Sequence, residues 1–123
     1  MGQFADGSLI PLYPDVTDPT GQITQSDQEH VVLAPGYYLI SYKVSVLFSR
    51  PNYMQITPYY NGAPHLDKGI YFATSADGSS AAGAAFIILD APAQTVFTLT
   101  YAGSAPASEG EVHLTILKLR RSV

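Results

Sequence analysis

Residues 37–48 read YYLISYKVSVLF, and this stretch decides the fold. Every second residue in it is large and apolar, and the positions between are mixed in character. Six consecutive matches to a period of two indicate a β-strand that buries one face, because neighbouring side chains of a strand point to opposite sides. A helix would need a period of 3.6 residues, which this stretch does not show. The apolar set is Tyr38, Ile40, Tyr42, Val44, Val46 and Phe48.

Shorter segments of the same kind lie on both sides of this strand. The Asn61-Gly62 pair predicts a type I′ hairpin turn, because both central residues of that turn need a positive φ. Pro58 lies inside a strand pattern and predicts an edge or a bulge, since proline cannot donate a ladder hydrogen bond. Further strands are expected at residues 30–33, 54–60, 69–73, 81–89, 95–101 and 112–119, with shorter candidates at 8–12 and 22–24.

The number of strands sets the fold class. Eight to ten short strands in 123 residues, without a convincing helix, predict an all-β sandwich or barrel. The length is typical of one domain and is sufficient to bury a core without covalent cross-links. The chain has no cysteine, which excludes disulfides, thiol catalysis and Cys-ligated metals.

The composition narrows the choice of partners. Charged residues make up 13% of the chain, about half the usual share in soluble domains. A net charge of −4 offers no basic face for nucleic acid, and no apolar run reaches the ~20 residues of a membrane-spanning helix. We therefore expect no nucleic-acid partner and no membrane insertion. The small number of charged residues predicts instead a largely neutral surface, part of which a partner protein covers.

The segment VVLAPGYYLISYKVSV at residues 31–46 resembles a known family of jelly rolls. A Pro-Gly-x-Tyr turn that leads into a long alternating strand is found in the heads of complement q-subcomponents and in tumour necrosis factor. The bacterial branch is more similar, namely the C-terminal domains of BclA-type collagen-like glycoproteins of the Bacillus exosporium. The hairpin at 57–64, the small-then-apolar strand at 81–89 and the closing strand at 114–119 also fit, so the resemblance covers roughly residues 20–120.

The resemblance implies a tumour necrosis factor-like jelly-roll sandwich of about ten strands in a tight homotrimer. Residues 1–20 would be an N-terminal arm with a short first strand, and residues 21–123 the trimerisation domain. The implied function is a structural head that caps and aligns a collagen-like filament on a spore or bacterial surface. The chain would be either the head of a protein whose collagen-like stalk precedes it or a stalkless relative. The alternatives are a trimeric head that recognises a glycan or a protein receptor, and a phage spike knob.

The expected trimer contacts follow from the phase of two strands. If the even-numbered set of residues 37–48 faces the core, the large odd-numbered residues point outward and would form an exposed apolar patch in a monomer. In the family, the sheet with the first, third and last strands faces the threefold axis. On the last strand, Leu114 and Ile116 would then point into the core. The outward residues expected as trimer contacts are Tyr37, Leu39, Leu47, His113, Thr115 and Leu117.

Nine tyrosines are too many for one small core. Exposed tyrosine is common at binding surfaces, because the ring adds apolar area while the hydroxyl stays hydrogen-bonded. Two interpretations remain open, of which contact between protomers is favoured over a platform for carbohydrate. The carbohydrate surface would contain Tyr53, Tyr59 and Tyr60.

No motif points to catalysis or to a cofactor. The chain lacks a Gly-x-Ser-x-Gly elbow, a phosphate loop and a His-Glu-x-x-His pair, so we expect neither an enzyme nor a bound metal. His65 and Asp67 are spaced to share one face of a strand but have no further ligands nearby. Asp15, Asp18 and Asp77 are interpreted as turn residues, with calcium binding as the alternative.

Overall fold

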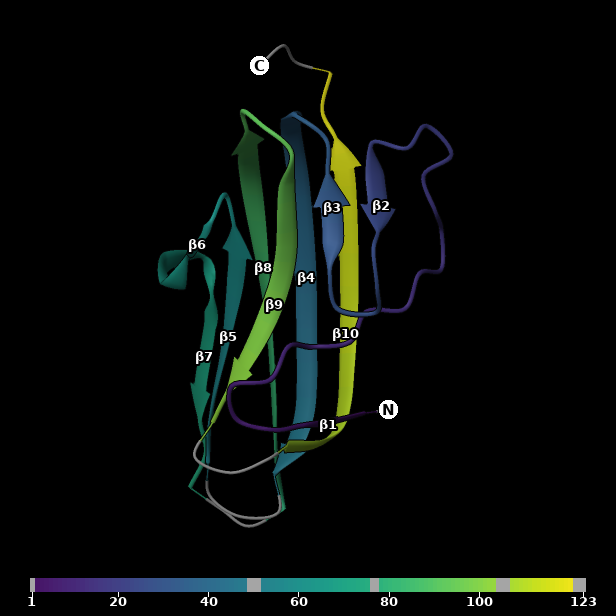
Figure 1. Cartoon of the computed structure of the whole chain (residues 1–123). Coiled ribbons are helices and arrows are strands. Elements are labelled where there is room, and N and C mark those ends of the chain that lie inside the picture. Colours follow the sequence, from purple (N-terminus) through teal and green to yellow (C-terminus); the bar gives the residue numbers. More distant parts are fainter. Residues whose placement is uncertain (1, 49–51, 76–77, 104–106, 121–123) are drawn as a thin grey trace.

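Ten antiparallel strands in two layers make up the fold (Figure 1). A computed structural model describes residues 2–48, 52–75, 78–103 and 107–120. These residues are all-β apart from the short 3-10 turn η1 (Leu66–Lys68). None of the described segments forms a helix that is long and apolar enough to cross a membrane. The strands are β1 (Gly2–Phe4), β2 (Ile23–Gln25), β3 (Val31–Leu33), β4 (Gly36–Phe48), β5 (Tyr53–Tyr60), β6 (Ala63–Pro64), β7 (Ile70–Ala73), β8 (Ser79–Ala91), β9 (Thr95–Ala102) and β10 (Ala107–Lys118).

The strands form two sheets. Sheet I has four strands in the order β1-β10-β4-β8, and sheet II has six, in the order β2-β3-β9-β5-β6 with β7 also paired to β5. Buried side chains from both sheets belong to one core cluster, which is the arrangement of a β-sandwich. The chain crosses between the sheets repeatedly, since β4, β8 and β10 lie in sheet I while β3, β5 and β9 lie in sheet II.

The long strand β4 supplies the largest part of this core. Its six even-numbered apolar side chains are at most 2% exposed, as the alternation predicts. Both of its edges are paired along most of their length, with β10 on one side and β8 on the other. Burial of six large side chains at about 1.5–3 kcal/mol each makes this one face a major stabilising element of the domain.

The turn into β4 requires glycine. Gly36 has a φ of 153°, a conformation that side-chain-bearing residues rarely adopt. A Cβ atom there would also lie 2.7 Å from Cε of Lys118. The Pro-Gly pair that precedes the alternating stretch therefore fixes where β4 begins.

The hairpin after β5 has the expected turn but a more complex return. Asn61 and Gly62 have φ values of 52° and 77°, which confirms the type I′ turn. The return strand is split, because β6 pairs with Tyr59 and Tyr60, η1 interrupts the ladder, and β7 then pairs with residues 53–56. The sequence pattern predicted only the second of these two strands.

The split explains how β5 accommodates Pro58. The carbonyl oxygen of Pro58 accepts a hydrogen bond from the N–H of His65 at 2.9 Å. The N–H and C=O of a strand residue face the same side, so the Pro58 nitrogen lies in the gap between β6 and β7. Because neither β6 nor β7 pairs with β5 at that point, the N–H that proline lacks does not remove a hydrogen bond of the sheet. β5 as a whole is not an edge strand, so the edge predicted at Pro58 exists only at this gap.

The N-terminal arm differs most from expectation. Its first strand is β1, which pairs with β10, and the strand expected at residues 8–12 is wrong, because only Leu9 forms a bridge, to Thr100 of β9. The arm nevertheless packs into the common core, where Phe4, Ile10 and Leu12 are buried. It thus crosses from the edge of sheet I to sheet II and joins the two.

A tyrosine of β4 ties sheet I to the segment between the sheet II strands β6 and β7. The hydroxyl of Tyr42 donates a hydrogen bond to the carbonyl oxygen of Lys68 in η1 at 2.5 Å. Burial, with a smaller contribution from Tyr60, raises the pKa of Tyr42 from 10.0 to about 12. The folded protein therefore holds Tyr42 neutral over a range of pH in which the unfolded chain would ionise it.

Replacement of Tyr42 by phenylalanine tests this contact. At neutral pH we expect Tyr42→Phe to lower the free energy of unfolding by about 1 kcal/mol, the usual net value of one hydrogen bond. In the wild type the stabilising effect of the raised pKa is complete below pH 10 and is lost as the pH rises toward 12. Denaturant unfolding across this range should show a shallower loss of stability in Tyr42→Phe. Equal slopes for the two proteins would contradict the assignment.

Candidate functional site

All six residues expected as trimer contacts lie on the outer face of sheet I. On β4 the odd-numbered positions point away from the core, and they include Tyr37, Leu39 and Leu47. On β10 the outward positions include His113, Thr115 and Leu117, while Leu114 and Ile116 pack against the core as predicted. Direct pairs across the two strands are Lys43 with His113, Ser41 with Thr115 and Leu39 with Leu117.

Two further apolar residues lie on this face that sequence analysis did not single out. Phe86 and Ile88 of β8 stand opposite Ser41 and Leu39 of β4, and they are 75% and 60% exposed. Leu117, Leu39 and Ile88 thus form a row across three strands, and Phe86 lies in the next row. We call these four residues the sheet I patch: Leu39, Phe86, Ile88 and Leu117.

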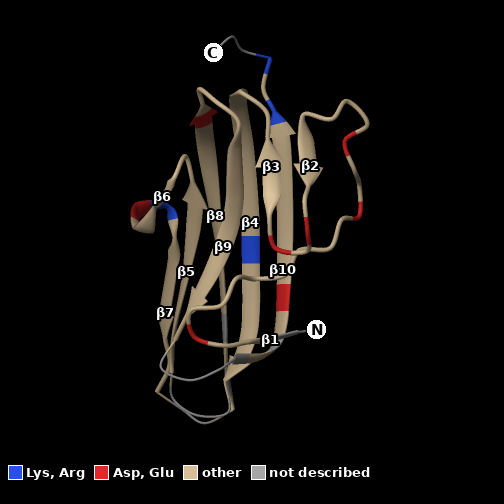
Figure 2. Cartoon of the chain, in the orientation of Figure 1, with Lys and Arg blue, Asp and Glu red and all other residues tan. Residues whose placement is uncertain are grey.

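Charged residues border the sheet I patch on two sides. At one end Asp90 stands opposite Tyr37, and at the other Lys43 stands opposite His113. In Figure 2 the blue of a basic residue lies midway along β4, and Lys43 is the basic residue of that strand. An apolar centre with a polar rim is the usual anatomy of a protein–protein contact.

Leu47 lies on the same face but apart from the patch. It is eight residues beyond Leu39 on β4, a separation of about 27 Å at the rise of an extended strand. Its neighbours across the sheet are Ser80 and Ser108. The structure therefore brings together Leu39 and Leu117, with Tyr37 and Thr115 beside them, and places Leu47 in separate, more polar surroundings.

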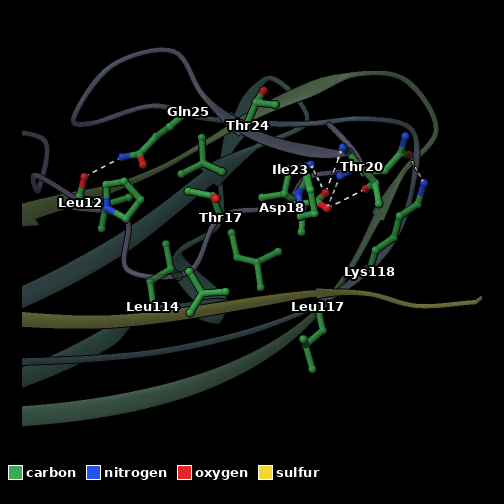
Figure 3. Close-up of a pocket in the computed structure, with 16 residues that line it drawn as sticks. Leu12, Thr17, Asp18, Thr20, Ile23, Thr24, Gln25, Leu114, Leu117 and Lys118 are labelled. Carbon is green, nitrogen blue, oxygen red and sulfur yellow. Dashed lines mark hydrogen bonds between the residues drawn. The ribbon is translucent and has the colours of Figure 1, made fainter.

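A cleft of about 720 Å³ opens beside the C-terminal part of β10, beyond the residues of β10 that pair with β1 (Figure 3). Figure 3 shows Leu114 pointing toward it and Leu117 on the opposite side of β10. The loop before β2 forms its other wall, which includes Val16 and Thr17. The volume is in the range of small-molecule sites, which normally also have polar groups that converge on the ligand.

The polar groups around this cleft are engaged by the chain itself. Asp18 accepts hydrogen bonds from the backbone N–H groups of Thr20, Gln22 and Ile23 at 2.9–3.0 Å, and from the Thr20 hydroxyl at 2.7 Å. These bonds lower the pKa of Asp18, with the Thr20 hydroxyl as the largest cause. Lys118 donates to the side chain of Gln22 at 2.5 Å. The interpretation of Asp18 as a turn residue thus fits its contacts.

The remaining metal candidates lie in turns. His65 precedes η1 rather than lying in a strand, its Nε2 is 3.0 Å from the Tyr60 carbonyl oxygen, and its ring stacks on that of Tyr60. Asp27, Glu29 and His30 place their ligand atoms within 4.8 Å of one another, and His30 Nδ1 lies 2.7 Å from Asp27. The expectation for Asp77 falls outside the described residues.

The tyrosines expected on one carbohydrate surface divide between two sides of sheet II. Tyr53 and Tyr59 lie on its outer side, the half-buried and exposed positions of β5. Tyr60 points inward, is only 6% exposed, and stacks between His65 and Phe97 with centroid distances of 3.7 and 6.2 Å. The prediction is wrong for Tyr60, because adjacent strand residues face opposite sides.

No protein-family model matches the chain, and the comparison with curated proteins gave no significant match.

Replacement of Asp18 tests whether its carboxylate orders the wall of the cleft. Asp18→Asn puts an amide N–H₂ where two backbone N–H groups need an acceptor, so the melting temperature should fall at neutral pH. Because the pKa of Asp18 is lowered from 3.8, its stabilising effect is present above pH 3.8 and is lost as the pH falls through the lowered pKa. The difference in melting temperature should therefore shrink in acid. Asp15→Asn, in the same exposed loop, is the control, and a difference that does not change with pH would contradict this role.

Proposed function

We propose that this chain is a jelly-roll head that forms a homotrimer through the outer face of sheet I. The observation that carries the proposal is the sheet I patch, in which Phe86, Ile88 and Leu117, the last 55% exposed, surround Leu39 on a regular sheet. Large aliphatic and aromatic side chains gathered on one face of a soluble domain mark a contact surface. Association would bury them at a centre that has a charged rim.

The order of the strands supports the jelly-roll part of the proposal. Jelly rolls are antiparallel double sheets in which the chain passes between layers in two Greek keys. Here sheet I contains the first strand β1, the last strand β10 and the long strand β4. The family resemblance of residues 31–46 assigns that sheet to the threefold axis. A closed ring of three joins unlike surfaces, so the patch of one protomer would meet a different surface of the next.

The proposed role is structural. A trimeric head of this kind would cap and align three chains of a collagen-like filament on the outer surface of a spore or bacterium, as the resemblance to BclA-type domains implies. The neutral composition of the chain suits such a role, because the protomers would be held together by buried apolar surface and not by disulfides. The proposal needs no metal, cofactor or catalytic group.

The oligomeric state is the first test. Light scattering of the purified chain should give three times its 13.2 kDa, and Leu117→Asp should reduce this to the monomer mass, because each of the three contacts would then bury an unpaired charge against an apolar surface. Leu66→Asp is the matched control, since Leu66 is also exposed but lies in η1, away from sheet I. A wild-type monomer at micromolar concentration, or equal effects of both substitutions, would refute the proposal.

The capping role has a separate test. The chain would be fused behind a Gly-x-y tract, whose triple helix melts with a circular dichroism signal of its own. We expect the fused tract to melt at a higher temperature than the free tract, because a trimeric head holds the three strands in one place and raises their effective concentration. The same fusion with Leu117→Asp should melt like the free tract. If the head is trimeric but the fused tract melts at the same temperature as the free tract, the proposed capping role is wrong, although the proposed trimer stands.

A further inference from the structure

The six strands of sheet II contain no charged residue and no histidine in the part of the chain that the structure describes. In Figure 2 the strands β3, β5, β7 and β9 are tan along their whole length, whereas β4 and β10 of sheet I have blue or red segments. The charged residues of these two strands include Lys43 and Glu111. An outer sheet face in contact with solvent is normally where charged side chains gather. The absence of charge from all six strands therefore requires an explanation other than burial.

Around β5 the outer face of sheet II is nevertheless polar, whereas Val96 of β9 is an exposed apolar residue on the same face. Its outward positions on β5 are Tyr53, Gln55, Thr57 and Tyr59. Across the sheet Tyr71 stands opposite Gln55, and Thr100 stands opposite Thr57. Aromatic rings, hydroxyls and a primary amide thus lie on one surface, which we call the sheet II face: Tyr53, Gln55, Thr57, Tyr59, Tyr71 and Thr100.

The rings on this face are held in place and remain accessible. Tyr53 and Tyr71 are diagonal neighbours on paired strands, and their rings stack with centroids 6.0 Å apart and planes 22° apart. Tyr71 is 63% exposed and Tyr59 40% exposed. Tyr59 lies six residues from Tyr53 along β5, about 20 Å at the rise of a strand. The face therefore presents two aromatic positions with Gln55 and Thr57 between them.

We propose that the sheet II face binds a neutral oligosaccharide of several units. A pyranose ring offers apolar C–H surface to an aromatic ring and hydroxyls that both donate and accept hydrogen bonds. The stacked tyrosines can contact the C–H surface, and the threonine hydroxyls and the Gln55 amide can exchange hydrogen bonds with the sugar hydroxyls. The strands of this face supply no cation for an anionic glycan, and the charges of η1 at the edge of the sheet are of both signs, with Lys68 Nζ 4.0 Å from Asp67. Tyrosine also anchors protein contacts, but the outward positions of β5 and β7 carry no Leu, Ile or Val beside it, unlike the sheet I patch.

This site lies on the opposite sheet from the sheet I patch and does not depend on trimerisation. A monomer would still bind, with lower avidity. Failure of the trimer would therefore leave this proposal open to its own test, and failure of glycan binding would leave the trimer untouched.

The test is an array of neutral hexose and N-acetylhexosamine oligosaccharides, with uronate and sulfated oligosaccharides beside them. We expect binding to at least one neutral member, unchanged by added salt because no ion pair forms. Tyr71→Ala and Tyr59→Ala should each weaken it by roughly 2- to 10-fold, the effect of losing one stacked ring, and Tyr71→Phe should retain most of the affinity. The matched control is Tyr13→Ala, which removes an exposed tyrosine of the N-terminal arm.

Backbone amide shifts of the wild-type protein locate the site without any substitution. Titration with the bound oligosaccharide should move the signals of Gln55, Thr57 and Thr100 on the sheet II face. No binding to any neutral oligosaccharide, binding to anionic members only, an equal loss in Tyr13→Ala, or shifts confined to the cleft beside β10 would each overturn the proposal.

Discussion

The structure depends on the burial of one face of β4. Its even-numbered side chains fill the space between the sheets, and a shift of one residue would expose all of them and bury Lys43. This large asymmetry fixes the register of β4, and β10 and β8 then align to it along both edges. The same constraint leaves Tyr37, Leu39 and Leu47 facing outward. The exposed apolar residues of sheet I are thus a direct consequence of the pattern that builds the core.

Sequence patterns predicted those elements whose structure is decided locally. The alternation of residues 37–48 and the Asn61-Gly62 pair are local signals, so β4 and the turn after β5 were predicted correctly, whereas the split of the return strand was not. The N-terminal arm was not, because Phe4 and Ile10 are isolated apolar residues in a turn-rich stretch. Their burial is decided by distant partners, such as the ring of Tyr101, 5.7 Å from that of Phe4. A contact between residues so far apart in the sequence leaves no pattern in the residues around Phe4.

The candidate site shows the same division. The outward residues of β4 and β10 could be predicted because apolar and polar positions alternate there. Phe86 and Ile88 could not, since residues 86–89 are all large and apolar and a continuous apolar run does not say which side faces the core. Only pairing with β4 settles the phase of β8. The prediction for Tyr60 failed for a related reason. Tyr59 and Tyr60 are adjacent on one strand, so their side chains point to opposite sides of the sheet and cannot belong to one surface.

The two outer faces of the sandwich differ in kind, and this difference links the two proposals. Sheet I combines an apolar centre with charges at its border, which favours a permanent partner. Sheet II has stacked rings and hydroxyls but no charge, which favours a ligand that binds weakly and reversibly. If sheet I faces a threefold axis, sheet II necessarily faces outward on all three sides of the trimer. Three identical weak sites on one rigid body can then bind a repeating polysaccharide far more tightly than any one of them, because the second and third contacts form at high effective concentration. Trimerisation would in this way supply the affinity that an uncharged stacking surface lacks by itself.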